Sequence, residues 1–144
     1  MGMILDSCIW IALATGKLSQ EEVINAAADS EIFVSVITLG ELSFGVHSCK
    51  NPAERAVRAA FLRQLEIRPV LDISQHTASG FGLLAAAIKH SGRSPRPRYN
   101  DLWIAAQAIE NGHSLLTLNS NDFIDLPGLE IVSIVPSTGN YPQP

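Results

Sequence analysis

Residues 3–11 read Met-Ile-Leu-Asp-Ser-Cys-Ile-Trp-Ile, an apolar run that an aspartate and a hydroxyl residue interrupt. The segment Met3-Ile4-Leu5 is short and wholly apolar, which predicts a strand buried on both faces. Asp6 or Ser7 can cap a helix that follows directly and runs through about Thr15. A buried strand followed at once by a helix predicts the first unit of a parallel α/β sheet.

Strand-like and helix-like segments alternate along the rest of the 144 residues. Further strands are predicted at 32–34, 68–71, 114–118 and 130–135, and helices at 38–49, 51–65, 74–90 and 101–110, with one more that begins at Ser19. The alternation predicts one α/β domain over residues 1–135, built on a parallel sheet of about five strands. Residues 136–144 are rich in proline, glycine and polar residues and are predicted to form a flexible tail.

The composition excludes several classes of protein. Hydrophobic residues make up 47% of the chain and charged residues 17%, so a folded core is expected rather than disorder. The net charge of −4 provides no overall attraction for nucleic acid, so any such binding needs a local basic patch. Two cysteines are too few for a disulfide framework. No apolar run is long enough to cross a membrane and no secretory leader is apparent, so a cytoplasmic protein is expected.

Four acidic residues lie at the junctions of predicted elements: Asp6, Glu41, Asp101 and Asp122. In open α/β sheets, ligands bind beyond the carboxyl ends of the strands, where these residues are expected to meet. Two carboxylates about 4 Å apart repel each other by roughly 4 kcal/mol at an effective dielectric near 20. Mg²⁺ or Mn²⁺ would remove that repulsion and could activate a water molecule for attack on a phosphodiester. The pattern therefore predicts a metal-dependent phosphodiesterase site.

Each acid also fits a role that needs no metal. Asp6 fits a helix cap, Glu41 a solvated helix position, Asp101 a first-turn residue that favours the helix dipole, and Asp122 a turn. The coincidence of all four at element junctions favours the metal site. Nearby polar side chains suit the orientation of metal ligands, although helix capping or turn formation explains them equally well: Ser7, Thr38, Thr117 and Asn119.

A basic loop precedes Asp101. Arg93, Arg96 and Arg98 fall within six residues of one another, and prolines stiffen the segment. The arginines suit contacts with RNA phosphates, and a solvated mobile loop explains them about equally well.

Four local motifs resemble, in order, those of the PIN-domain ribonucleases, most closely the VapC-type toxins of toxin–antitoxin pairs. The first is the opening strand with Asp6, at residues 3–11. The others are Ser-Val-Ile-Thr-Leu-Gly-Glu-Leu at 35–42, Asn-Asp-Leu-Trp-Ile-Ala-Ala at 100–106 and Leu-Leu-Thr-Leu-Asn-Ser-Asn-Asp-Phe at 115–123. Together they span nearly the whole chain.

The resemblance implies a three-layer α/β/α sandwich around a parallel sheet. It implies Mg²⁺ or Mn²⁺ bound mainly by Asp6, Glu41 and Asp101, and cleavage of single-stranded or loop RNA by a metal-activated water. It also implies a homodimer that a small VapB-type antitoxin silences by covering the acidic cleft. Relatives often carry an acid at or near the position of Asn119, which leaves open whether Asn119 or Asp122 completes the site.

A second function remains open, that of a non-catalytic PIN-like interaction module whose acids stabilise the fold or receive a partner. The presence of all four carboxylates argues against this function, because their mutual repulsion is costly and a site without catalytic use would tend to lose them. The sequence does not identify the RNA target, the antitoxin or the dimer interface.

Overall fold

The structure is a computed structural model and describes residues 2–136. Its strands are β1 (Gly2–Leu5), β2 (Glu31–Ser35), β3 (Val70–Leu71), β4 (Ser114–Thr117) and β5 (Ile131–Ser133). Its helices are α1 (Ser7–Ala14), α2 (Gln20–Ala27), α3 (Val36–Ser48), α4 (Pro52–Glu66), α5 (Gln75–His90) and α6 (Tyr99–Asn111), with short 3₁₀ helices η1 (Arg96–Arg98) and η2 (Ser120–Asp122). The predicted tail at 136–144 lies, apart from its first residue, outside the described residues.

All five strands pair in parallel, in the order β3-β2-β1-β4-β5. The chain builds the sheet outward from β1 to β3, then returns to the other side of β1 with β4. The strand order therefore reverses between β1 and β4, and such a switch point opens a crevice at the carboxyl ends of the strands. Asp6 and Thr117 lie at that point of the sheet.

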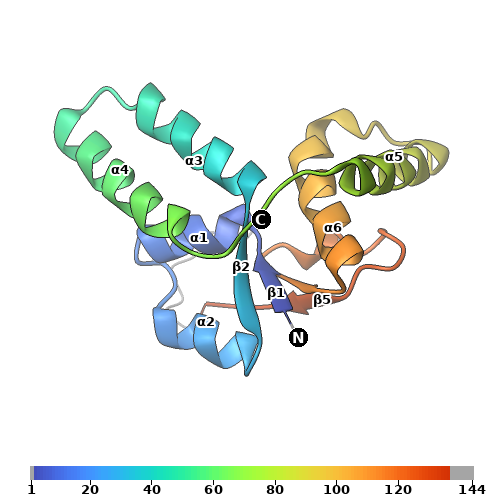
Figure 1. Cartoon of the computed structure of the whole chain (residues 1–144), viewed down its shortest axis with the longest axis horizontal. Helices are drawn as coiled ribbons and strands as arrows, with labels where there is room; N and C mark the ends of the chain where they lie inside the picture. The colour runs from blue at the N-terminus through green and yellow to red at the C-terminus, as the bar shows by residue number, and fades with distance from the viewer. Residues whose placement is uncertain (1, 137–144) are drawn as a thin grey trace.

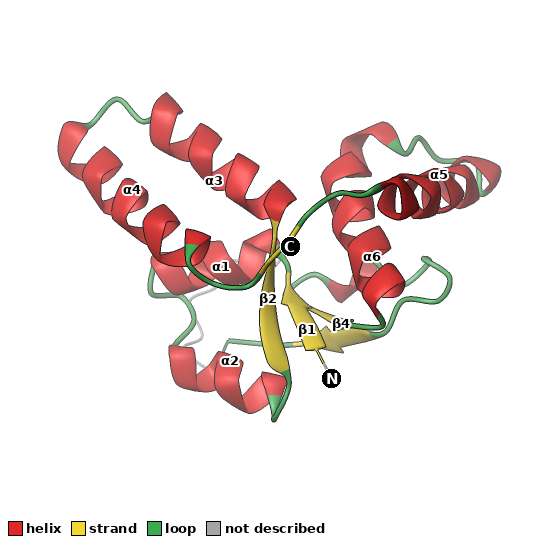
Figure 2. Cartoon of the chain, viewed as in Figure 1, coloured by secondary structure: helices red, strands yellow, loops and turns green. Residues whose placement is uncertain are grey.

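The sheet separates two apolar clusters because consecutive strand residues face opposite sides. Met3 and Leu5 pack in the cluster that includes residues of α1, α2 and α4, whereas Ile4 packs in the cluster formed with α5 and α6. Leu115 and Leu116 divide in the same way. Helices thus cover both faces of the sheet, with α1 and α2 on one side and α5 and α6 on the other (Figures 1 and 2). The predicted α/β/α sandwich is confirmed.

Helix starts differ from the sequence-based boundaries at two places. Helix α3 begins at Val36 rather than Thr38, because the side chain of Ser35 caps it by accepting from the backbone N–H of Ile37 at 3.1 Å. Helix α6 begins at Tyr99 rather than Asp101, because η1 leads directly into it. Within residues 2–136, no helix is long and apolar enough to cross a membrane.

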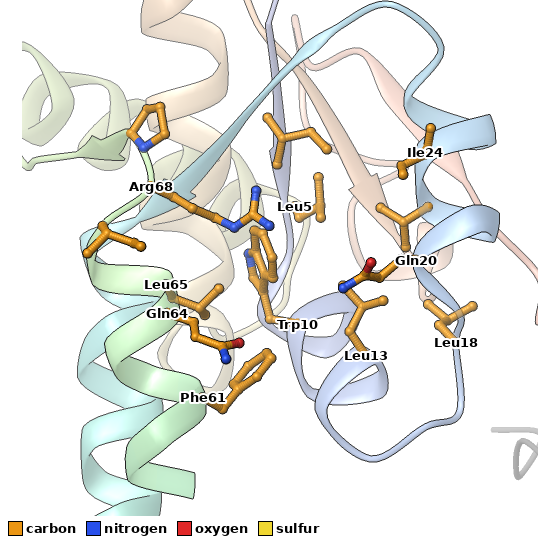
Figure 3. A pocket seen from close by; sticks show the side chains of 14 residues that line it. Leu5, Trp10, Leu13, Leu18, Gln20, Ile24, Phe61, Gln64, Leu65 and Arg68 are labelled. Atoms are coloured by element: carbon orange, nitrogen blue, oxygen red, sulfur yellow. The ribbon is translucent and has the colours of Figure 1, made fainter. Parts of the chain in front are cut away.

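The two tryptophans differ in burial. Trp10 is 3% exposed, and the guanidinium carbon of Arg68 lies 5.5 Å from its ring centroid. These side chains line an apolar hollow of about 630 Å³ bordered by α1, α2 and α4 (Figure 3). Trp103 is half-buried and stacks on Phe81 with ring centroids 4.0 Å apart, so it joins α6 to α5.

Candidate active site: an acidic cluster at the carboxyl edge of the sheet

Asp6 is held at the end of β1 by both its backbone and its side chain. Its N–H donates to the carbonyl of Leu116 at 2.9 Å, which extends the β1–β4 pairing by one residue. The carboxylate is 6% exposed and accepts from the Ser7 N–H at 2.8 Å, the Thr117 hydroxyl at 2.9 Å and the Cys8 thiol at 3.3 Å. Burial raises the pKa of Asp6 above its ordinary value, against these three hydrogen bonds, and the charge of Asp122 raises it further.

Ser7 connects the Asp6 region to Glu41, although the two acids are 35 positions apart in the sequence. The Ser7 hydroxyl donates to Oε1 of Glu41 at 2.8 Å and lies 2.9 Å from the hydroxyl of Thr38. Because an ionised carboxylate only accepts, Ser7 uses its single proton on Glu41, and Thr38 donates to Ser7. Burial raises the pKa of Glu41, as does the charge of Asp6, while the bond from Ser7 lowers it.

Asp101 reaches the same edge of the sheet from the first turn of α6. Burial, followed by the charges of Asp6 and Asp122, raises its pKa to about 6, and Glu41 adds to the rise. Arg98 acts in the opposite direction. Asp122 is exposed at the end of η2, yet its charge acts on both Asp6 and Asp101. The fold therefore brings all four sequence-predicted acids within electrostatic reach of one another.

The donor chemistry of this cluster fits a hard divalent cation, which prefers carboxylate and water oxygens. Burial is the main cause of the raised pKa values of Asp6, Glu41 and Asp101, and the neighbouring acids add to it, so a cation among them would favour their ionised forms. Within residues 2–136, however, no three acidic, histidine or cysteine side chains already stand as a closed metal-ligand group. The four acids lie in one region and carry charges of the same sign. Their side chains would have to move before they could bind one ion.

Of the other predicted orienting residues, Thr117 contacts a carboxylate and Asn119 does not. Fully buried Thr117 donates its hydroxyl proton to Asp6 and accepts from the backbone N–H of Asn119 at 3.1 Å. Asn119 enters this arrangement only through that N–H among the described residues. Thr117 thus fixes both the orientation of Asp6 and the chain direction after β4.

The predicted basic loop is partly neutralised within the fold. Arg93 forms an ion pair with Asp125, and Arg98 contacts the same carboxylate at 3.4 Å. Arg96 forms no ion pair with another described residue. The loop thus offers less free positive charge than its sequence indicates.

Two positioning features are not evident from the sequence. Gln107 is fully buried in α6, where its amide donates to the carbonyls of Leu71 and Asp72 and its side-chain oxygen accepts from the Ser35 hydroxyl. It thereby joins the helix of Asp101 to the ends of β2 and β3. An amide on the apolar side of a helix is the one signal that points to it. Cys8 is half-buried, and burial beside Asp6 raises its pKa to about 12, so it remains a donor.

Comparison with known proteins identifies the class. Residues 3–129 match the model of the PIN domain, and the chain belongs to the PIN-domain family. It is 34% identical over 140 residues to Ribonuclease VapC1 of Rickettsia felis, covering 93% of this chain and 97% of the relative. It is 32% identical over 132 residues to Ribonuclease VapC5 of Mycobacterium tuberculosis, covering 92% and 93%.

Solved structures agree with this assignment. The crystal structure of VapBC-5 from Mycobacterium tuberculosis, a member of the VapBC family of toxin-antitoxin systems, matches with a TM-score of 0.72 and 29% identity. The match covers 92% of this chain and 98% of that chain. The resemblance to VapC-type PIN domains that the four motifs indicate is therefore confirmed.

Proposed function

We propose that this chain is a metal-dependent endoribonuclease and the toxin of a toxin–antitoxin pair, held inactive by a small VapB-type antitoxin. One observation carries the proposal: Asp6 after β1, Glu41 of α3, Asp101 of α6 and Asp122 of η2 gather at the switch point of a PIN-domain sheet, where burial and then neighbouring carboxylates raise the pKa of the first three. The relatives named ribonucleases support the activity, and the solved VapBC complexes support the partner. Action on RNA implies a cytoplasmic location.

In the proposed site, Asp6, Glu41 and Asp101 hold Mg²⁺ or Mn²⁺, with Asp122 beside them. When bound, the ion would neutralise the carboxylates, stabilise charge on a phosphoryl oxygen and lower the pKa of a water molecule. Three hydrogen bonds fix the orientation of Asp6. Ser7 fixes Oε1 of Glu41 and leaves its Oε2 without a described hydrogen bond, so that one oxygen remains for a ligand.

The polar side chains around the acids would act by orientation. Ser7 donates to Glu41 and Thr117 donates to Asp6, and each bond favours the ionised carboxylate, which is the form that binds a cation. Ser7 and Thr117 are both buried, which limits competition from water for these contacts. The ligand oxygens would therefore be oriented by residues of α1, α3 and β4 that do not themselves need to touch the ion.

The experiment is an endonuclease assay of the purified chain on single-stranded RNA, with Mg²⁺, Mn²⁺ or EDTA. Asp6→Asn, Glu41→Gln and Asp101→Asn should each abolish cleavage and retain a cooperative thermal transition. Asp29→Asn is the matched control, because it makes the same chemical change at an exposed acid between α2 and β2. Parental cleavage by Asp101→Asn, or full activity in EDTA, would refute the mechanism. A wild-type chain that binds its antitoxin but cuts no RNA would favour the non-catalytic interaction module.

A further inference from the structure

One face of α3 forms the wall of a groove that contains Glu41. Ile37, Gly40, Glu41 and Phe44 follow the spacing i, i+3, i+4, i+7, which places them on one side of the helix. They line an open groove of about 680 Å³ together with Val36 and, from α6, Asn100. Helices α3 and α6 contact each other, and Glu41 belongs both to this groove and to the acidic cluster. The groove is therefore continuous with the acidic cluster.

Phe44 is the unusual residue of this groove. Its side chain is 75% exposed, so it contributes little to the core, although it lies one turn beyond Glu41. Gly40, next to Glu41 on the same face, borders open space, because a Cβ there would meet no heavy atom within 4 Å. Glycine inside a helix costs about 1 kcal/mol relative to alanine, so helix stability does not favour the small residue at this position.

Asn100 stands across the groove from the α3 face. Its side chain is exposed and forms no hydrogen bond with another described residue. A planar aromatic face and an amide with free donors and an acceptor are the two groups with which proteins contact unstacked bases. A second copy of this chain would gain less here, because docking would bury Glu41 and Asn100 together with Phe44.

Electrostatics alone is a poor source of RNA affinity in this protein. The net charge is −4, the site itself is acidic, and Arg93 and Arg98 are paired with Asp125. Single-stranded RNA therefore needs contacts that do not depend on charge. Stacking of a base on an aromatic side chain is such a contact, and its loss weakens binding by roughly 5- to 150-fold per base.

We propose that Phe44 is the stacking platform for a base of single-stranded RNA beside the cleaved phosphate, and that Asn100 contacts the edge of that base. The inference rests on the proposed ribonuclease function and adds to it a substrate-positioning residue. Phe44 touches the base and leaves the chemistry to the carboxylates. Removal of the Phe44 ring should therefore weaken RNA binding and leave the metal concentration needed for cleavage unchanged.

The binding test uses Asp101→Asn as the parent, so that RNA stays intact, and a fluorescein-labelled oligoadenylate in Mg²⁺. Phe44→Leu keeps an apolar side chain without an aromatic face and should weaken binding about tenfold. Phe44→Trp should bind within about twofold of the parent, because stacking tolerates any aromatic ring. Ile24→Ala is the control, since Ile24 is an exposed apolar residue on α2, away from the groove, and should change nothing.

A chemical double-mutant cycle identifies the contact. Oligoadenylates with one abasic nucleotide, placed at each position in turn, should include one that binds the parent about tenfold more weakly. That oligonucleotide should bind Phe44→Leu no more weakly than the intact RNA does, because both changes remove the same stack. If the losses of affinity from Phe44→Leu and from the abasic nucleotide add at every position, the proposal is wrong. Gly40→Leu fills the groove without altering Phe44 and should also weaken binding.

The remaining outcomes separate this inference from the proposed function. If wild-type protein neither binds nor cleaves RNA, the proposed function fails. If wild-type protein cleaves RNA and Phe44→Leu binds and cleaves equally well, only the stacking role fails. If Phe44→Leu changes the sedimentation coefficient to that of another oligomeric state, Phe44 is a contact between copies of the chain and the inference is wrong.

Discussion

Replacing Asp101 by asparagine should abolish cleavage and yet make the metal-free protein more stable at neutral pH. Burial, and after it Asp6 and Asp122, raises the pKa of Asp101 from 3.8 to about 6. A rise of that size corresponds to about 3 kcal/mol for a fully shielded group. Asp101 is only half-buried, so solvent screening reduces the expected effect to about 1.5 kcal/mol.

The sign follows from proton linkage. Between about pH 4 and pH 6, the folded chain holds a proton on Asp101 that the unfolded chain has released. The stability of the wild type should therefore fall as pH rises through this window, with the whole penalty present above it. Asp101→Asn cannot ionise and escapes the penalty. The free energies of unfolding should differ at pH 7.5 and converge near pH 4.

The assay is urea denaturation of both proteins in EDTA at low ionic strength, at pH 4 and at pH 7.5. Guanidinium chloride is unsuitable because it would screen the repulsion. At pH 7.5 the variant should be more stable by about 1.5 kcal/mol, which is about 3–6 °C in Tm for a chain of this size. Asp29→Asn should show no such gain. A variant no more stable than the wild type at pH 7.5, or a difference that persists at pH 4, would refute the reasoning.

Three further predictions follow from the site. Mn²⁺ at about ten times its Kd should stabilise the wild type by about 1.4 kcal/mol, and a calorimetric scan showing no shift would count against the metal site. Thr117→Val removes the hydroxyl that orients Asp6; the Mn²⁺ concentration for half-maximal cleavage should rise about tenfold, and an unchanged requirement would exclude this role. Gln107→Leu leaves the carbonyls of Leu71 and Asp72 without their donor; it should lower the free energy of unfolding by about 3 kcal/mol in urea titrations, whereas a neutral result would show that water replaces the amide.

Local sequence patterns were sufficient to predict the helices and strands of this fold and to identify its acidic site residues. Hydrophobic periodicity and capping residues predicted the helix that starts after Asn51, with proline at its first position. They also predicted the helix after Ser74, where the structure has a Ser74–Thr77 capping box. Glycine disfavours a helix interior, yet α5 is continuous through Gly80 and Gly82. The structure gives the reason at Gly80, where a Cβ would lie 3.4 Å from the Cβ of Ala106, so the glycine serves close packing of α5 on α6.

The sequence by itself determined the alternation of strands and helices, and it identified Asp6, Glu41, Asp101 and Asp122 as residues at element junctions, because capping and periodicity act over a few neighbouring positions. Only the tertiary structure decided which side chains meet. The hydrogen bond from Ser7 to Glu41, the pairing of Arg93 and Arg98 with Asp125, and the contacts of Gln107 with β2 and β3 join residues 27 to 72 positions apart. Such contacts follow from the strand order, and no short window of sequence encodes that order.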